Sequence, residues 1–156
     1  MTDAAQRAEG LAVRARIMGE DWVSAAGQGP GLAAFTERAI DQVWSTVWTD
    51  PALELRLKSV TTISVLAALG HLGELRAHAA GALRAGLLDA AELRAVVLHA
   101  LPYVGFPAAR HAMVVVDEVV AAADSTDQSR EELDEPGRER SGRYAPSRYR
   151  AAAPAE

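Results

Sequence analysis

Apolar side chains recur every three or four residues along most of the chain, and this interval is the period of an α-helix. Residues 32–48 show it most clearly. Their apolar stripe consists of Phe35, Ala39, Ile40, Val43, Trp44, Val47 and Trp48. No segment shows a convincing alternation of apolar and polar residues, which would indicate a β-strand. The pattern therefore predicts an all-α fold of six or seven helices.

Residues that begin and end helices divide this pattern into segments. The run at residues 28–31, Gln-Gly-Pro-Gly, breaks the chain before the stripe. Asp50 is a candidate N-cap, because Pro51 follows it at the first helical position. Gly70 and Gly86 are placed to end the two helices that come next.

The second half of the chain contains two further helix signals. Asp89, with Glu92 three residues later, predicts a capped helix start. Pro102 should interrupt that helix, and residues 103–107 should form a turn. The predicted helices span residues 4–18, 20–26, 32–48, 52–69, about 73–85, the stretch between Asp89 and Pro102, and about 108–123.

Hydrophobicity also predicts where these helices lie. The sequence VTTISVLAAL, residues 60–69, is apolar on nearly all sides, so we expect the helix at 52–69 to be central and buried. After Ala123 the chain becomes polar, with acidic residues first and arginines later. We therefore predict a helical domain at residues 1–123 and a loosely attached polar tail at residues 124–156.

Composition and charge narrow the possible functions. The net charge is −5, so no basic field attracts nucleic acid. The chain has no cysteine, which excludes disulfides, thiolate metal ligands and thiol redox chemistry. We see no membrane span and no apolar core of a signal peptide. These features predict a cytoplasmic protein with neither a nucleic-acid partner nor a membrane partner.

The stretch GHLGELRAHAAGALRAG, residues 70–86, carries His71, Glu74 and His78 at spacings of three and four. The commonest reason for such a group is a solvated helix face or a satisfied ion pair. A metal site is a second possibility, but residues seven apart lie about 10.5 Å apart along a helix axis. His99 and His111 could add ligands, although their spacing matches no known motif. Acid–base chemistry is the third, because Glu74 and His78 can meet at this spacing.

Three sequence patterns occur in a fixed order along the chain. They are W-x-x-x-W-x-x-P-x-L from Trp44, A-A-L-G-x-x-x-E-L-x-x-H-x-x-G-A-L-x-x-G from Ala67, and Y-x-G-x-P-A-A from Tyr103. In combination they resemble the carboxymuconolactone decarboxylase family, from about Ala8 to Val120. The resemblance implies the helical fold shared with alkylhydroperoxidase D, and homo-oligomers, often trimers or hexamers.

The resemblance also bears on the reaction. The redox branch of this superfamily carries a C-x-x-C pair where His71 and Glu74 stand, so peroxidase chemistry is not available to this chain. The decarboxylase branch typically has E-L-x-x-H, which Glu74, Leu75 and His78 match. It implies a decarboxylase that needs no cofactor and no metal and acts on an anionic small molecule such as 4-carboxymuconolactone. Gly73 stands where that branch often carries histidine.

Spacing and resemblance together suggest roles for six residues. His78 would donate the proton. Glu74 would orient the His78 imidazole and keep it charged. His71 would line the entrance or bind a carboxylate. Arg56 or Lys58 would anchor the anion, unless they are ordinary surface charges. Tyr103 would hydrogen-bond the substrate, unless it is a packed turn aromatic.

Two other interpretations of the same fold remain open. The histidine at position 71 and the long tail modestly favour an enzyme of specialised metabolism that decarboxylates, isomerises or cyclises a larger substrate. A non-catalytic helical assembly protein is the other. Trp44 and Trp48 fit a core or a subunit interface better than a cofactor site.

Overall fold

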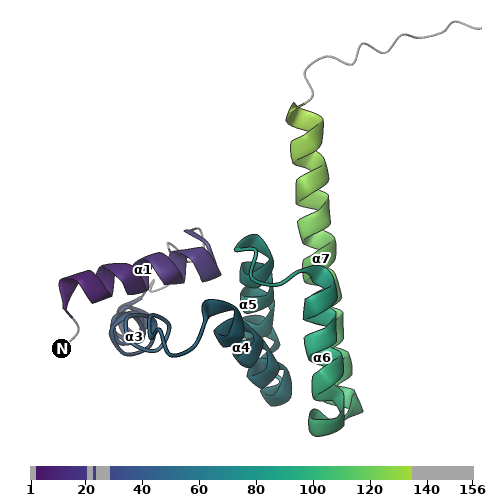
Figure 1. Ribbon diagram of the computed structural model, residues 1–156, viewed down its shortest axis with the longest axis horizontal. Coiled ribbons are helices and arrows are strands. Elements are labelled where there is room, and N and C mark those ends of the chain that lie inside the picture. The colour runs from purple at the N-terminus through teal and green to yellow at the C-terminus, as the bar shows by residue number, and fades with distance from the viewer. Residues whose placement is uncertain (1–2, 21–22, 24–28, 135–156) are drawn as a thin grey trace, which may run out of the picture.

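The computed structural model describes residues 3–20, 23 and 29–134, and within these ranges the chain is helical and has no strand (Figure 1). This confirms the all-α prediction. The elements are α1 (Ala4–Met18), α3 (Pro30–Ala39), the π-helix η1 (Ile40–Trp44), α4 (Leu55–Leu69), α5 (Leu72–Arg84), α6 (Ala90–Val104) and α7 (Phe106–Asp134). None of the described helices is long and apolar enough to cross a membrane.

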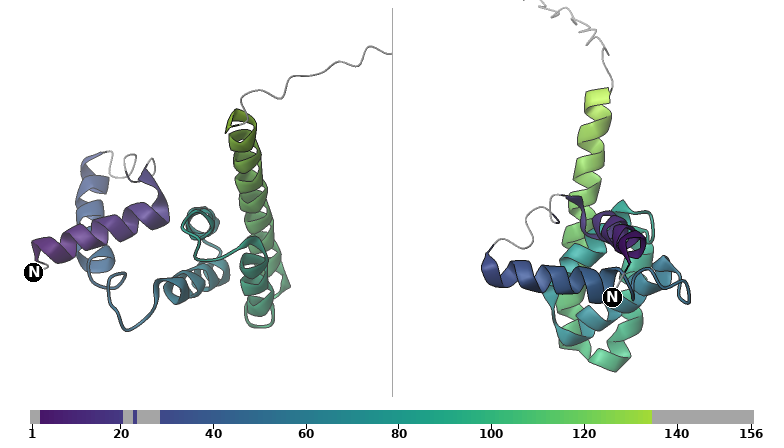
Figure 2. Two further views of the ribbon diagram at one scale, coloured as in Figure 1. Left: turned by 45° about the horizontal axis from the view of Figure 1, so that its top comes forward. Right: turned by 90° about the vertical axis from the view of Figure 1, so that its left-hand side faces the viewer.

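Helix α5 joins the two halves of the molecule. It packs against α1 on one side and against α4 and α7 on the other. Helices α1 and α3 lie at one end, α6 and α7 at the other, and α7 extends beyond the remaining helices (Figures 1 and 2). A residue on α5 can therefore face either half, which makes this helix the natural place for a site.

Two apolar clusters hold the halves together. The larger combines buried side chains of α4, α5, α6 and α7, with Ile63, Leu75, Leu93 and Val116 at its centre. The smaller consists of Ile17, Met18, Ile40, Trp44 and Trp48, and Ala77 of α5 packs against it. The second cluster contains Ile40, Trp44 and Trp48 of the stripe in the sequence. Phe35, Val43 and Val47 of the same stripe are exposed in the single chain.

Helix α1 docks onto α5 and η1 through glycines. A Cβ atom added to Gly81 of α5 would lie 1.7 Å from the carbonyl oxygen of Ile17. A Cβ atom at Gly10 of α1 would lie 2.5 Å from the Ser45 hydroxyl oxygen. Only glycine allows backbones to approach this closely.

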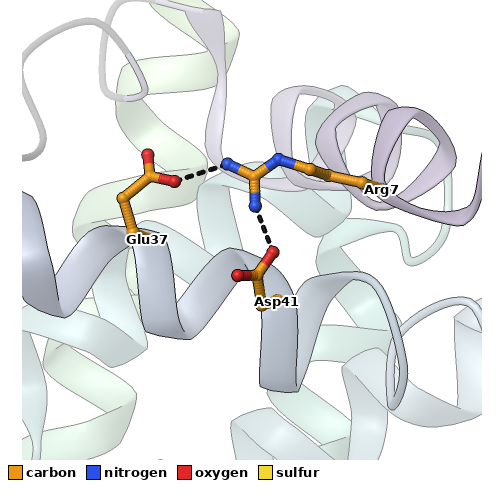
Figure 3. Close-up of polar contacts among 3 residues, drawn as sticks. All are labelled: Arg7, Glu37 and Asp41. Carbon is orange, nitrogen blue, oxygen red and sulfur yellow. Dashed lines mark hydrogen bonds and ion pairs between the residues drawn. The ribbon is translucent and has the colours of Figure 1, made fainter. Parts of the chain in front are cut away.

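Charged side chains reinforce the same junction. The guanidinium of Arg7 on α1 contacts both Glu37 of α3 and Asp41 of η1, and its bond to Glu37 measures 2.6 Å (Figure 3). Arg84 of α5 donates a hydrogen bond of 2.9 Å to the Ile17 carbonyl oxygen. Helices far apart in sequence are thus tied by arginine as well as by apolar packing.

Several predicted helix ends are confirmed. Helix α1 spans the predicted residues 4–18. Gly70 and Gly86 follow α4 and α5 with φ of 71° and 64°, in the left-handed region that glycine tolerates best. Asp89 begins α6 with a capping box, in which its carboxylate accepts from the Glu92 N–H at 2.8 Å.

Other predicted boundaries are wrong. The stripe at 32–48 is not one helix, because α3 begins at Pro30 and residues 40–44 form a π-helix. Asp50 does not cap α4. Its carboxylate accepts from the Ala52 N–H at 2.8 Å, which makes a local turn, and the helix starts only at Leu55. The predicted helix at 20–26 lies mostly outside the described residues.

Pro102 does not interrupt α6 as predicted. The helix continues through it to Val104 and ends at Gly105, whose φ is 85°. The proline lies in the last turn of α6. It lacks one N–H donor, but few helical hydrogen bonds follow it, so the helix tolerates it at this position. Phe106 then begins α7, so the predicted turn at 103–107 shrinks to one residue.

Two larger expectations also change. Helix α4 is not buried on all sides, because Val65 and Leu69 are 49% and 63% exposed in the single chain. The predicted boundary at Ala123 falls inside α7, which runs to Asp134. Residues 135–156 of the predicted tail lie outside the described residues.

The close approach of α1 to α5 predicts a strong effect of one methyl group. Gly81→Ala should destabilise the fold by about 2 kcal/mol or more, because the helices must separate to admit it. Gly73→Ala, on the same helix but with open space around its Cβ position, should stabilise by about 0.5–1 kcal/mol. Urea unfolding followed by circular dichroism measures both, and equal stabilities would contradict the close packing.

Candidate active site

The His78 side chain, near the middle of α5, lies against two tryptophan rings. The His78 and Trp48 ring centroids are 5.8 Å apart with an interplanar angle of 17°, and the Trp44 centroid is 6.4 Å from that of His78. The two indoles stack on each other at 4.9 Å. Both tryptophans are buried, which confirms that they belong to the core. They also form one wall of the histidine's surroundings, a contact that the sequence analysis did not foresee.

The π-helix places these indoles. Its wider turn appears in the hydrogen bond of 2.9 Å from the Ser45 N–H to the Ile40 carbonyl oxygen, five residues back. Trp44 ends η1, and Trp48 lies in the turn that follows, four residues on. This spacing puts both rings on the side that faces α5.

The environment of His78 favours the neutral imidazole. Its Nδ1 atom is buried and has no hydrogen-bond partner. Burial lowers the pKa of His78, and the nearby negative charge of Glu74 raises it by less. In the isolated chain, Glu74 therefore does not offset the effect of burial as the sequence analysis expected.

The other two members of the trio lie at the exposed start of α5. His71 is the N-cap residue, although its side chain makes no capping bond, and Glu74 lies in the first turn. Both are exposed, whereas His78 is half-buried one turn further along. The α5 N-terminus lies at this end, and the helix dipole there favours an anion.

Lys58, a predicted anion anchor, does not extend its ammonium into solvent. Its side chain is buried, and its ammonium donates to the carbonyl oxygens of Trp48 at 2.9 Å and Asp50 at 2.6 Å. It is thereby linked to the His78 site through Trp48.

The remaining two predicted residues are not brought to His78. Arg56 pairs with Glu92 at the start of α6. Tyr103, on the last turn of α6, is 78% exposed, and its ring lies 5.8 Å from that of His99. The described chain thus groups His78 with Trp44, Trp48 and Lys58, and leaves Arg56 and Tyr103 on the surface.

A separate hollow of about 620 Å³ lies between α5 and α7. Its charged lining includes Arg76 and Glu118, which pair with each other across the two helices. No predicted site residue lines it. Within the described part of the chain, no group of three His, Asp or Glu side chains could hold a metal ion.

Comparison with known proteins adds a second kind of evidence. Residues 33–118 match the family model described as the carboxymuconolactone decarboxylase family. The chain is 33% identical over 123 residues to the 4-carboxymuconolactone decarboxylase of Acinetobacter baylyi. The aligned region covers 76% of this chain and 90% of that protein. It is 32% identical over 118 residues to the nitrosuccinic acid decarboxylase of Metarhizium robertsii, covering 72% of this chain and 79% of that protein.

The buried imidazole predicts a pH dependence of stability. Its pKa is lower in the folded chain than in the unfolded chain, so the unfolded chain binds more protons once the pH falls below about 6.5. The free energy of unfolding should therefore decrease as the pH is lowered through that range. His78→Asn should lessen this loss between about pH 7.5 and 5.5, whereas replacement of the exposed His111 by Asn should not. Urea unfolding at the two pH values measures it, and equal losses in wild type and His78→Asn would refute the assignment.

Proposed function

Because the chain belongs to the carboxymuconolactone decarboxylase family, we propose that it is a decarboxylase that needs no cofactor. Its substrate is an anionic acid in which the electrons left by CO2 spread into an acceptor group of the substrate itself. The observation that carries the proposal is the half-buried His78 against two indoles, in the segment where family members carry E-L-x-x-H.

His78 serves as the proton donor in this proposal. Burial favours the neutral imidazole of His78, but an anion bound beside it raises the pKa and favours the imidazolium. The parallel indole faces stabilise that cation further. Substrate binding and proton uptake are thereby coupled.

The reaction then needs one bond to break and one to form. The carbon–carbon bond to the carboxylate breaks, CO2 leaves, and the bonding electrons pass into the acceptor group. The imidazolium of His78 gives its proton to carbon, and solvent restores it. The apolar wall of Trp44 and Trp48 keeps water from the leaving carboxylate.

The start of α5 is where the rest of the anion binds in this proposal. His71 and the α5 N-terminus receive a second carboxylate, and Glu74 orients His78. Arg56 and Tyr103 remain candidates for substrate contacts from the surface.

The first substrate we propose is a carboxylated unsaturated lactone like 4-carboxymuconolactone, with the lactone carbonyl as the acceptor. The Metarhizium relative favours a second, because its name specifies nitrosuccinic acid. A nitro group accepts the same electron pair as a nitronate. The position of the histidine at residue 71 and the glycine at 73 also favours an acid other than the lactone.

An activity assay tests the site. With 4-carboxymuconolactone or nitrosuccinate, metal-free protein should release CO2 and consume substrate. His78→Ala should lower kcat/KM about a hundredfold or more, because proton donation is lost. The replacement of His111 by Ala is the control. Full activity of His78→Ala with an unchanged helical spectrum would refute the role of His78. No turnover of either acid by wild type would favour the non-catalytic alternative.

We also propose that the protein is a homotrimer or a larger homo-oligomer. The support is the exposed apolar side chains of the described residues, which include Val65 and Leu69 on α4 and Phe106 at the start of α7. Exposed apolar side chains in such number are typical of a surface that packs against another protein molecule.

The mass in solution tests the assembly. Light scattering coupled to size exclusion should give a trimer or a multiple of it at micromolar concentration. Leu69→Glu should lower the mass, because a charge cannot be buried unpaired in an apolar interface. A wild-type monomer would contradict the proposal.

A further inference from the structure

The single lysine of the chain lies beside the candidate site. Lys58 is the only lysine among the 156 residues, and all other non-histidine bases are arginines. Its side chain is 9% exposed. The structure gives it two backbone carbonyl partners and, within the described residues, no ion pair with a carboxylate. A buried ammonium held by carbonyls alone is uncommon, because most buried charges are paired.

The two carbonyls belong to the segment that carries Trp48. Residues 45–54 connect η1 to α4 through turns, without a regular helix. The Trp48 N–H bonds to the Val43 carbonyl oxygen at 3.0 Å, and the Trp48 carbonyl accepts from Lys58. The Trp48 backbone is thereby fixed from both sides. The next carbonyl that Lys58 holds, that of Asp50, fixes the exit of the turn.

The indole of Trp48 transmits this restraint to the site. The centroid of its ring lies 4.9 Å from that of Trp44 and 5.8 Å from that of His78. A movement of the Trp48 backbone would move the ring that faces the imidazole. Removing the ammonium would also leave two carbonyls without their partner, which costs free energy unless the segment moves to find water.

We propose that Lys58 is a positioning residue, which fixes the turn at residues 48–50 and through it holds the Trp48 ring against His78. The consequence for catalysis rests on the proposed function of His78, whereas the placement of the ring does not. Lys58 suits this task because an ammonium is a compact donor to two oxygens at different angles, whereas a guanidinium is a planar fork.

Ring-current shifts provide a direct test. In wild type, the ring protons of His78 should be shifted upfield by the stacked indoles, and His78→Asn identifies their signals. Lys58→Met should abolish most of that shift, and Lys58→Arg, which keeps donors but in a planar fork, should retain only part of it. Arg56→Met is the matched control, because Arg56 is the exposed cation two residues earlier. Val97→Ala lowers stability from the other cluster and should leave the shift unchanged.

A measurement on wild type decides the case even if Lys58→Met does not fold. With one lysine, selective 15N labelling gives one side-chain ammonium signal. Slow exchange of its protons with water supports the buried bonds. Exchange as fast as that of a free lysine overturns the proposal, as does a folded Lys58→Met variant with an unchanged His78 shift.

Turnover separates this role from the proposed function. If the protein decarboxylates a tested acid, Lys58→Met should lower kcat about ten- to a hundredfold with little change in KM, because the proton donor is misplaced rather than the binding groups. An inactive wild type would refute the proposed function and leave the spectroscopic test intact. A loss confined to KM would instead indicate that Lys58 binds the anion, and would overturn the positioning role.

Discussion

The contact of α1 with α5 at Gly81 is the constraint on which the candidate site depends. The Ile17 carbonyl comes so close to the glycine that a side chain cannot fit. This fixes α1 on a helix that contributes to both apolar clusters. Helix α1 in turn holds η1, through Gly10 against Ser45 and through Arg7. The tryptophans therefore reach His78 by a chain of rigid contacts rather than by direct sequence proximity.

Two basic groups then contact Trp48, Lys58 at its backbone carbonyl and the half-buried His78 at its ring. Lys58 is charged and is satisfied by backbone carbonyls, whereas His78 has a buried Nδ1 without a partner. The difference has a physical cause. The lysine ammonium meets carbonyl oxygens that favour positive charge, while the imidazole meets aromatic faces and one exposed carboxylate. The same neighbourhood thus holds the Lys58 side chain through two hydrogen bonds and disfavours the charged form of His78.

Local signals in the sequence were sufficient for some elements and not for others. The glycine ends of α4 and α5 and the capping box of Asp89 follow from a few neighbouring residues, and these predictions are confirmed. The π-helix and the start of α4 depend on partners outside their own segment. Asp50 looks like an N-cap until the Ala52 N–H and Lys58 are seen to bind it.

The site shows the same division. The spacing of Glu74 and His78 follows from helix geometry, so the sequence could place them together. The sequence could not show that burial lowers the pKa of His78 by more than Glu74 raises it, because the indoles and the enclosing helices come from other parts of the chain. Lys58 resembles a surface charge at a helix start, and its burial depends on the Trp48 and Asp50 carbonyls of the preceding turn.

The two named relatives suggest that different parts of such a site carry out the reaction and select the substrate. Their names specify different acids, a lactone and a nitro compound, although each is about one-third identical to this chain. In both acids the electron acceptor belongs to the substrate. What the protein must add is a proton at the right place and shelter from water, and His78 with its indole wall can supply both. The residues that tell one acid from another must then lie where the rest of the molecule binds. The proposed function assigns that place to the exposed start of α5, where His71 and Gly73 lie. The proposed function thus separates the chemistry, at the more buried part of α5 around His78, from the choice of substrate, at the exposed start of the same helix.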